Sequence, residues 1–344
     1  MNRARTATVT VTVFGLGAVF LSLGANAQDC NRDCLEGWVD RYLDAVIDDD
    51  PSALPMTRDV RFTENGVQLE IGDGLWRSMK SKGGYRLFVI DVPAQQVTLL
   101  TTIAEDDRTP AGEVPALMAL RLKIEGNRVG EIEQIVVRDA NAAGRVEAMG
   151  SPHPMYLQSI PLNRRMSRKD MLETANKYFT GMQQNDGRGD YPFSDDCHRI
   201  ENGSQATNAP TPPGETRPDP ATATGYSGQW TCLEQFESGL LHFVTRIRDR
   251  RFVAVDEERG LVFSFVFFDH PAGETRTFET PDGRTITAGP AQPWTWGIAE
   301  LFKVESDQIR QIEAILHRVP YGMNADWSTY EEGMSDALQD RTGV

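Results

Sequence analysis

Two stretches of the chain place apolar residues at the spacing of an amphipathic helix. Between residues 35 and 46, and again between 171 and 182, apolar side chains recur at intervals of three and four positions. Ser167 precedes the second stretch, where its hydroxyl can cap the free backbone N–H groups, and Asp170 falls in the first turn, where a negative charge is favourable. The pattern predicts two helices that each bury one face.

Strands follow each predicted helix. Asn65-Gly66 and Asn202-Gly203 lie between short alternating runs and have the sequence of a type I′ turn, whose two central residues both need positive φ. Short helices are expected at 74–80 and 233–243, and longer strands at 85–91, 97–103, 116–124, 130–138, 246–256, 261–269, 296–304 and 309–319. Helices followed by a run of strands predict an α+β fold with helices packed on one face of a curved antiparallel sheet.

The chain also repeats itself. Residues 55–66 recur without a gap at 192–203 with five of twelve positions identical, and residues 123–138 recur at 303–318. The offsets are 137 and 180, so the second copy holds 43 more residues between the two blocks. A period this long predicts two homologous domains and not a solenoid, whose units span about 20 to 50 residues.

The first 27 residues have the form of a signal peptide. Arg3 and Arg5 precede an apolar stretch at 9–23, and Ala25-Asn26-Ala27 fits a cleavage site. An uncleaved anchor is the alternative, but the stretch is shorter than the roughly 20 residues that span a bilayer. We therefore expect a periplasmic or secreted protein that does not contact the membrane after cleavage. The predicted organisation is a signal peptide (1–27), a first domain (28–140), a linker (141–166), a second domain (167–330, with insertions at 204–229 and 271–293) and a C-terminal tail (331–344).

Charge narrows the range of partners. The formal net charge is −15, and the predicted leader contains two arginines and no acid, so the mature chain is more acidic still. This balance argues against nucleic acid, whose phosphates require a basic face, and against anionic membrane surfaces. A small molecule is the expected partner.

Four cysteines in an exported chain favour disulfide bonds, and three connectivities are open. We favour Cys30–Cys34 and Cys197–Cys232, because each pair then lies within one repeat or its leader. The first pair closes a very short loop and should stabilise little, whereas the second would close a loop around the longer insertion. A redox role for the first pair is disfavoured, because that motif needs two intervening residues.

Several phrases of the second copy resemble a tandem SnoaL-like family of exported proteins from bacteria and fungi. They are R-I-E-N-G (199–203), V-D-E-E-R-G-L-V (255–262), A-E-L-F-K (299–303), I-R-Q-I-E-A (309–314) and V-P-Y-G-M (319–323). The first copy matches through its fold pattern and the E-N-G turn. The resemblance implies two tandem NTF2-like cone-shaped α+β barrels, each with an apolar pocket between its helices and the concave sheet. It also implies proton-transfer chemistry without a cofactor or metal.

Two histidines distinguish the copies. His198 stands where the first copy has Arg61, and His317 where it has Val137. Imidazole suits proton transfer because its ordinary pKa lies near neutrality. Structural roles, or a metal site formed with a carboxylate, are the alternatives.

The strand around His198 supplies further candidates. Asp196 lies two residues away on the same strand face and could orient the imidazole. We predict His198 as general base, positioned by Asp196, with His317 or Tyr321 as the partner acid. The alternative is that Asp196 caps a turn and both histidines are solvated at the edge of the sheet.

Aromatic residues concentrate in the second copy. Trp230 ends one insertion, and Trp294 and Trp296 follow the other, where they could form the wall of a pocket for a flat apolar compound. With Phe236 and Arg199 they make up the predicted substrate-binding set. Core packing is the alternative interpretation.

Two functions follow. One is a lyase or isomerase, of dehydratase or retro-aldol type, acting without a cofactor on a small apolar hydroxylated compound, with an aromatic compound as the favoured case. The other is a non-catalytic periplasmic binding module in which the copies form a pseudo-dimer. A homo-oligomer is a further partner that this fold allows.

Overall fold

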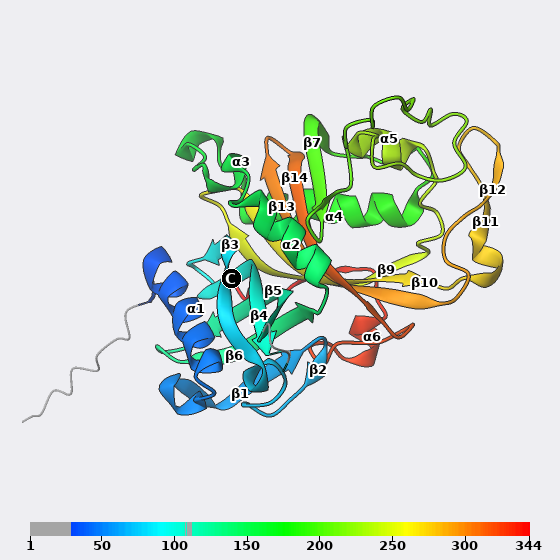
Figure 1. The fold of residues 1–344 in the computed structure, drawn as a ribbon. Helices are drawn as coiled ribbons and strands as arrows, with labels where there is room; N and C mark the ends of the chain where they lie inside the picture. The colour runs from blue at the N-terminus through cyan, green and yellow to red at the C-terminus, as the bar shows by residue number, and fades with distance from the viewer. Residues whose placement is uncertain (1–28, 107, 109–111) are drawn as a thin grey trace, which may run out of the picture.

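The same order of elements occurs twice in the fold (Figure 1). The computed structural model describes residues 29–106, 108 and 112–344, so the predicted signal peptide lies outside the described residues. The first repeat contains α1 (Arg32–Ile47), η1 (Pro51–Ala53), β1 (Met56–Glu64), β2 (Val67–Gln68), η2 (Gly74–Arg77), β3 (Met79–Asp91), β4 (Gln96–Asp106), β5 (Glu113–Ile124) and β6 (Val129–Val137). The second contains α4 (Arg168–Gln184), β7 (Phe193–Glu201), β8 (Ser204–Gln205), α5 (Cys232–Glu237), β9 (Arg246–Asp256), β10 (Leu261–His270), β13 (Trp294–Glu305) and β14 (Gln308–Val319).

The two repeats also share a sheet topology. The first sheet has the order β2-β1-β6-β5-β4-β3, and the second has the equivalent order β8-β7-β14-β13-β10-β9, extended by β15 (Leu338–Asp340). An α+β architecture built from an internal duplication is therefore confirmed.

Two details of the predicted sheets need correction. The sheets are mixed and not antiparallel, because β1 runs parallel to β6 and β7 runs parallel to β14. Within the described residues both sheets are curved but open, and their outermost strands do not pair with each other. The cone-shaped barrel implied by the resemblance is therefore not confirmed.

Local sequence signals determine the turns and the helix starts as predicted. Asn65 and Gly66 have φ values of 52° and 79°, and Asn202 and Gly203 have values of 47° and 73°. The Ser167 side chain accepts a hydrogen bond from the backbone N–H of Asp170 at the start of α4. Both long helices bury the predicted faces against the concave side of their own sheet.

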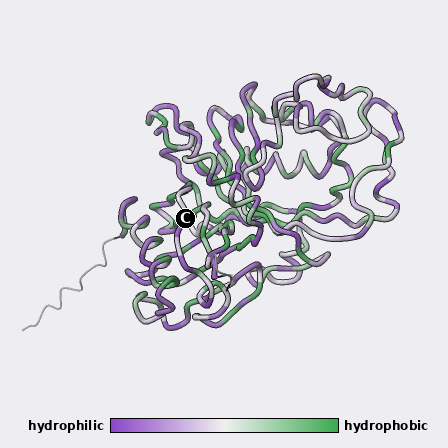
Figure 2. Tube along the Cα trace, in the orientation of Figure 1, coloured by the Kyte–Doolittle hydropathy of each residue, from purple (hydrophilic) through white to green (hydrophobic). Residues whose placement is uncertain are grey.

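The convex sides of the two sheets pack against each other. The core between them combines Leu87, Leu100 and Leu117 of the first sheet with Phe263 and Leu301 of the second. Figure 2 shows apolar segments gathered where the sheets meet. The second repeat thus covers the first, as in a dimer formed within one chain.

The segment between the repeats takes part in this core. It forms α2 (Ala140–Met149), α3 (Pro154–Leu157) and η3 (Leu162–Arg164). Ala142, Ala143 and Val146 of α2 are buried in the same cluster as the two sheets. Because α2 contributes buried side chains, this connection packs between the repeats and is more than a spacer.

The C-terminal segment crosses from the second repeat to the first. It forms α6 (Tyr330–Gly333) and β15, which pairs in parallel with β9. Before α6, the indole Nε1 of Trp327 donates to Thr63 Oγ1 at 2.8 Å, and Asp326 accepts from the backbone N–H of Gln68 at 2.9 Å. Within the predicted tail itself, Gln96 Nε2 of the first repeat donates to the carbonyl oxygens of Arg341 and Thr342, each at 3.2 Å, so the tail is also part of the contact between the repeats.

The insertions of the second repeat lie together at one end of the molecule (Figure 1). The later one contains η4 (Gly273–Arg276) and the hairpin β11 (Thr277–Glu279) and β12 (Thr285–Thr287). Phe278 and Ile286 of this hairpin form a small apolar cluster with Trp230 and Leu240. Among the described helices, none is long and apolar enough to cross a bilayer.

Both favoured disulfides are present, Cys30–Cys34 and Cys197–Cys232. We expect the double variant Cys197→Ser/Cys232→Ser to lose about 3 to 4 kcal/mol of unfolding free energy, because the bond closes a loop of 35 residues. Cys30→Ser/Cys34→Ser should lose about half as much, since its loop is only 4 residues. Urea unfolding of both variants checks this order, and an equal or reversed order would contradict it.

Candidate functional site

A cavity of about 230 Å³ lies on the concave side of the second sheet, between the sheet and α4. Its walls combine apolar and aromatic side chains with a small number of polar ones, which is typical of small-molecule sites. The polar residues are Tyr178, Arg199, Glu201, Tyr226, His270 and Glu300, and the aromatic ones include Phe243, Phe268, Trp294 and Trp296.

Side chains from one face of β13 form a row along the cavity wall. Trp294, Trp296, Ile298 and Glu300 alternate along the strand and therefore share its inward face. His270 pairs with Trp294 at one end, whereas Glu300 pairs at the other end with Ala314, which in turn pairs with Glu201. Six residues of strand separate the ends by about 20 Å. The cavity thus has an aromatic end and a polar end.

Arg199 is the central charge of the polar end. Its side chain is buried, and its guanidinium donates to Tyr178 Oη at 3.2 Å and to Gln235 Oε1 at 2.8 Å. Its Nε lies 3.1 Å from Glu201 Oε1. Burial opposes the charge, but the neighbouring Tyr178 and the acids Glu201 and Glu300 raise the pKa of Arg199, so it stays protonated.

Glu300 is the acid of the polar end. It is 1% exposed, and its Oε2 has no hydrogen-bond partner among the described residues. Burial, reinforced by the negative charge of Glu201, raises the pKa of Glu300 to about 8. At neutral pH the cavity therefore holds a carboxylic acid with a proton to donate, next to the ion pair of Arg199 and Glu201. Burial also raises the pKa of Tyr178 well above its usual value, so its hydroxyl is neutral.

Stacked rings form the aromatic end. The His270 ring lies parallel to Trp294 with centroids 4.0 Å apart, and Trp296 meets Trp294 edge-on at 4.5 Å. His270 Nδ1 lies 3.1 Å from the carbonyl oxygen of Phe268, which can only accept, so Nδ1 carries the proton and Nε2 is left as an acceptor. Burial lowers the pKa of His270 to about 4, which keeps the ring neutral at pH 7.

In the first repeat, apolar residues occupy the positions equivalent to three residues of this cavity. By the offsets of the duplication, Leu120 stands at the position of Glu300, Phe62 at that of Arg199 and Ala116 at that of Trp296. All three are buried in the apolar core of the first repeat. Arg199 and Glu300 are therefore particular to the second repeat, whereas Glu201 has a counterpart in Glu64 of the first.

Three members of the predicted substrate-binding set line this cavity: Arg199, Trp294 and Trp296. Phe236 lies in the core beneath, with its ring centroid 5.4 Å from that of Tyr178. Trp230 is fully buried under the insertions and donates to the carbonyl oxygen of Pro218 at 2.7 Å. These two aromatics support the walls and do not line the cavity.

The predicted pair of Asp196 and His198 does not form. The inward face of β7 carries Cys197 and Arg199, so His198 lies on the other face, where Nδ1 is 3.4 Å from the side chain of Gln205. Asp196 pairs with Arg310 instead, and hydrogen bonds from Arg310 and Ser194 lower the pKa of Asp196 to about 2. The prediction recognised the alternation of the strand but assigned the cavity to the wrong face.

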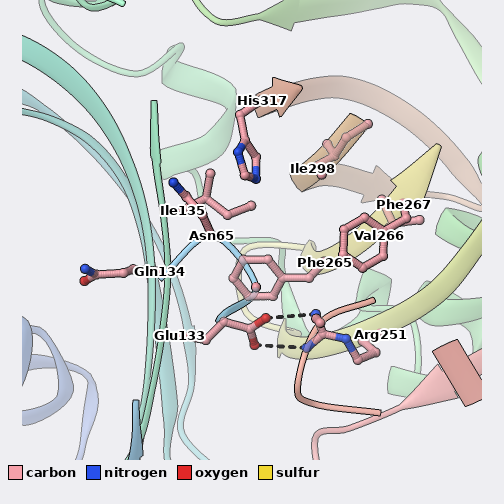
Figure 3. A pocket seen from close by; sticks show the side chains of 13 residues that line it. Asn65, Glu133, Gln134, Ile135, Arg251, Phe265, Val266, Phe267, Ile298 and His317 are labelled. Atoms are coloured by element: carbon pink, nitrogen blue, oxygen red, sulfur yellow. Dashed lines mark hydrogen bonds and ion pairs between the residues drawn. The ribbon is translucent and has the colours of Figure 1, made fainter. Parts of the chain in front are cut away.

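His317 lies between the two sheets and outside the cavity. Its ring points into a void of about 20 Å³ near Ile135 and Ile298, as Figure 3 shows. Burial lowers the pKa of His317 to about 4. Tyr321 is 44% exposed on the loop after β14. The four predicted acid–base residues are thus not brought together, and no cluster of three or more His, Cys, Asp or Glu side chains suited to a metal occurs in the described part of the chain.

The prediction did not include Glu300, His270, Tyr178 or Glu201. At the last of these positions the first copy also has an acid, Glu64, so a comparison of the copies does not single it out. One signal could have revealed Glu300. It occupies the core-facing register of an otherwise apolar and aromatic strand, at a position where the other copy has leucine. A buried acid without a partner is costly, so its presence at such a position points to a function.

The chain belongs to the family described as "Domain of unknown function (DUF8021)", whose model matches residues 28–136 and 164–316. No curated protein matches it significantly. Among solved structures, AusH from Aspergillus nidulans is 21% identical, covers 32% of this chain and 90% of its own, and has a TM-score of 0.26. AclR from Streptomyces galilaeus is 12% identical, with coverages of 33% and 84% and a TM-score of 0.25. A de novo designed protein with a curved β-sheet is 12% identical, with coverages of 44% and 88% and a TM-score of 0.23.

Proposed function

We propose that the second repeat of this DUF8021 member is a SnoaL-like catalytic domain of the NTF2-like type. It acts as a lyase or isomerase, without a cofactor, on a small and largely apolar hydroxylated compound that carries an aromatic ring. The observation behind the proposal is the buried, neutral acid Glu300 at the polar end of an aromatic-lined cavity, whose Oε2 has no hydrogen-bond partner among the described residues.

The aromatic end would hold the ring of the substrate. The indoles of Trp294 and Trp296 offer faces and edges for stacking, and Phe243 and Phe268 complete an apolar wall. The hydroxyl-bearing end of the substrate would then extend toward Arg199, Tyr178 and Glu300. The separation of about 20 Å between the ends of the β13 row is more than a single ring fills, so the substrate needs a side chain long enough to reach from the ring site to the polar end.

Two carboxyl groups in different surroundings provide the acid and the base: Glu300 is buried, and Glu201 forms an ion pair with Arg199. In the elimination of water, the Glu201 carboxylate removes a proton from the carbon next to the carbinol carbon, and that C–H electron pair forms the new double bond. The C–O bond breaks, and Glu300 gives its proton to the departing hydroxyl, which leaves as water. Arg199 and Tyr178 hold hydrogen bonds to the oxygen as charge develops on it. Proton transfer from Glu201 to Glu300 through solvent restores the starting state.

The proposal includes export. The leader-like sequence at 1–27 and the two disulfides are consistent with a periplasmic or secreted enzyme. An oxidising compartment would preserve Cys197–Cys232, which links β7, the strand of Arg199, to α5, the helix of Gln235. The disulfide thereby supports the position of the guanidinium.

The test is an incubation of residues 28–344 with a panel of hydroxylated aromatic compounds in the absence of added cofactor. Mass spectrometry would follow the loss of water or formaldehyde. We expect product from the unmodified protein and at least a ~10²-fold lower rate from Glu300→Gln, which keeps the shape of the side chain but cannot transfer a proton.

Glu313→Gln is the matched control. Glu313 is also a buried acid with a raised pKa, about 7, but its carboxylate accepts from Tyr85 Oη at 2.6 Å between the sheets, away from the cavity. This variant should keep the full rate. A rise in melting temperature with the compounds but no product from any of them would favour a binding module and rule out the enzyme.

A further inference from the structure

A second cavity, of about 380 Å³, lies at the seam between the two repeats, outside the catalytic site proposed above. Its walls come from β1, β5 and β6 of the first repeat, from β9 of the second and from the C-terminal segment. The volume falls in the range of small-molecule pockets, about 300 to 1,000 Å³, and is more than an inorganic ion would fill. No predicted site residue lies in it.

The cavity is basic although the protein is acidic. Among the described residues that line it, five are cations and two are acids. The cations are Arg61, Arg121, Lys123, Arg251 and Arg341, and the acids are Glu131 and Asp340. Because the chain has a formal net charge of −15, this concentration of positive side chains is not explained by composition.

Two of the cations are already neutralised by close acids. Arg251 donates to both carboxylate oxygens of Glu133, at 2.8 and 3.0 Å, and lies 3.0 Å from Asp249. Arg121 lies 2.7 Å from Glu131 and 3.3 Å from Glu133. The pair of Arg251 and Glu133 joins the two repeats, whereas the pairs of Arg121 lie within the first repeat; together they leave little charge on either arginine for a ligand.

Arg61 is different. Its guanidinium makes no ion pair with any described residue, and its Nε is buried without a hydrogen-bond partner. It is held in place by Trp327, whose ring centroid lies 4.6 Å from the Arg61 guanidinium and 4.6 Å from that of Arg121. The indole is itself fixed by its hydrogen bond to Thr63. A preorganised cation thus borders the cavity without an ion pair of its own, because Glu131, its partner in the strand register, is already paired with Arg121.

Lys123 and Arg341 are two further cations whose side chains can turn toward a ligand. The Lys123 ammonium lies 3.4 Å from Glu125 and 3.7 Å from Glu131, and its side chain is 33% exposed. Arg341 lies 3.1 Å from Glu332, and its side chain is 36% exposed. Partly exposed pairs of this kind are worth little, so both side chains can turn toward a bound anion at low cost.

We propose that this cavity binds a small organic oxyanion, a carboxylate or a phosphate ester, through Arg61 with support from Lys123 and Arg341. Guanidinium binds either group through paired N–H donors. Val253 offers the non-ionic part of the ligand an apolar contact. Since the walls belong to both repeats and to the C-terminal segment, the ligand would also strengthen the contact between them.

The experiment is a titration of residues 28–344 with succinate, glycerol phosphate and the neutral succinamide at constant ionic strength and pH 7. Calorimetry gives the affinity, and the melting temperature gives an independent readout. We expect saturable binding of at least one of the two anions with a dissociation constant below about 1 mM, and none of succinamide. Whichever anion binds more tightly identifies the preferred group.

Arg61→Gln should raise the dissociation constant of the anion that binds by at least tenfold. Arg58→Gln is the matched control, because Arg58 is exposed on the same strand and does not line the cavity. If circular dichroism shows that Arg61→Gln does not fold, Lys123→Gln replaces it, and its affinity for the anion should be at least threefold lower than that of the original protein. Absence of saturable binding of both anions, or equal affinity in the folded cavity variant and in Arg58→Gln, would overturn the proposal. Neither result would bear on the catalytic role of Glu300.

Discussion

Glu133→Leu is expected to lower the free energy of unfolding by about 3 to 5 kcal/mol. Glu133 is 4% exposed, and its carboxylate receives two hydrogen bonds from Arg251 of the other repeat (Figure 3). Removal of the acid leaves the Arg251 guanidinium buried between two sheets, where Asp249 is the one acid among the described residues that still pairs with it and the cation Arg121, which also contacts Glu133, lies nearby. A buried charge that has lost its main partner costs more than the pair contributed, because its hydration is not recovered.

The double variant Glu133→Leu/Arg251→Met separates this cause from a packing defect. It removes both charges and keeps apolar volume at the junction, so most of the lost stability should return. Urea unfolding of the three proteins gives the free energies. A double variant as unstable as Glu133→Leu, or a single variant within 1 kcal/mol of the original protein, would show that this ion pair does not control the contact between repeats.

Glu300→Leu is expected to stabilise the protein at pH 8 by roughly 2 to 4 kcal/mol while abolishing turnover. The variant restores the residue that the first repeat has at Leu120. The pKa of Glu300 is about 8 in the folded protein, against an ordinary 4.5. The folded state therefore retains a proton that the unfolded chain has lost, and the stability that Glu300 contributes falls as pH rises from about 4.5 to about 8.

The pH dependence provides the check. The difference in unfolding free energy between Glu300→Leu and the original protein should be small at pH 4.5 and should grow steadily up to pH 8. Glu300→Gln should show the same dependence on pH, because it too lacks the titrating group. A constant difference from pH 4.5 to 8 would mean that Glu300 is ionised in the folded protein, contrary to its proposed role as an acid.

Much of the local structure could be read from short stretches of sequence. The Asn65-Gly66 turn, the Ser167 cap and the apolar spacing of α4 each depend on residues within a few positions of one another. The disulfide Cys197–Cys232 could be favoured because the duplication showed where each repeat begins and ends. The parallel pairing of β1 with β6 was missed, because it joins strands about 70 residues apart and no local signal specifies it.

The candidate site was predicted in part for the same reason. Alternation along β7 separated Cys197, Arg199 and Glu201 from Asp196, His198 and Ile200, and the structure keeps that separation. The alternation does not say which set faces the cavity. That depends on which side of the sheet α4 covers and which side packs on the other repeat, so His198 was favoured although Arg199 is the residue that lines the site.

The sequence by itself determined the doubling of the fold, the helices and turns and the acidic character, because these follow from periodicity, turn chemistry and composition. Only the tertiary structure decided which strand faces enclose a cavity, that Glu300 Oε2 has no hydrogen-bond partner among the described residues, and that Arg61 and Trp327 meet across 266 positions of chain. Burial and the pKa of a carboxyl group depend on side chains that are distant in sequence, and folding alone brings those side chains together.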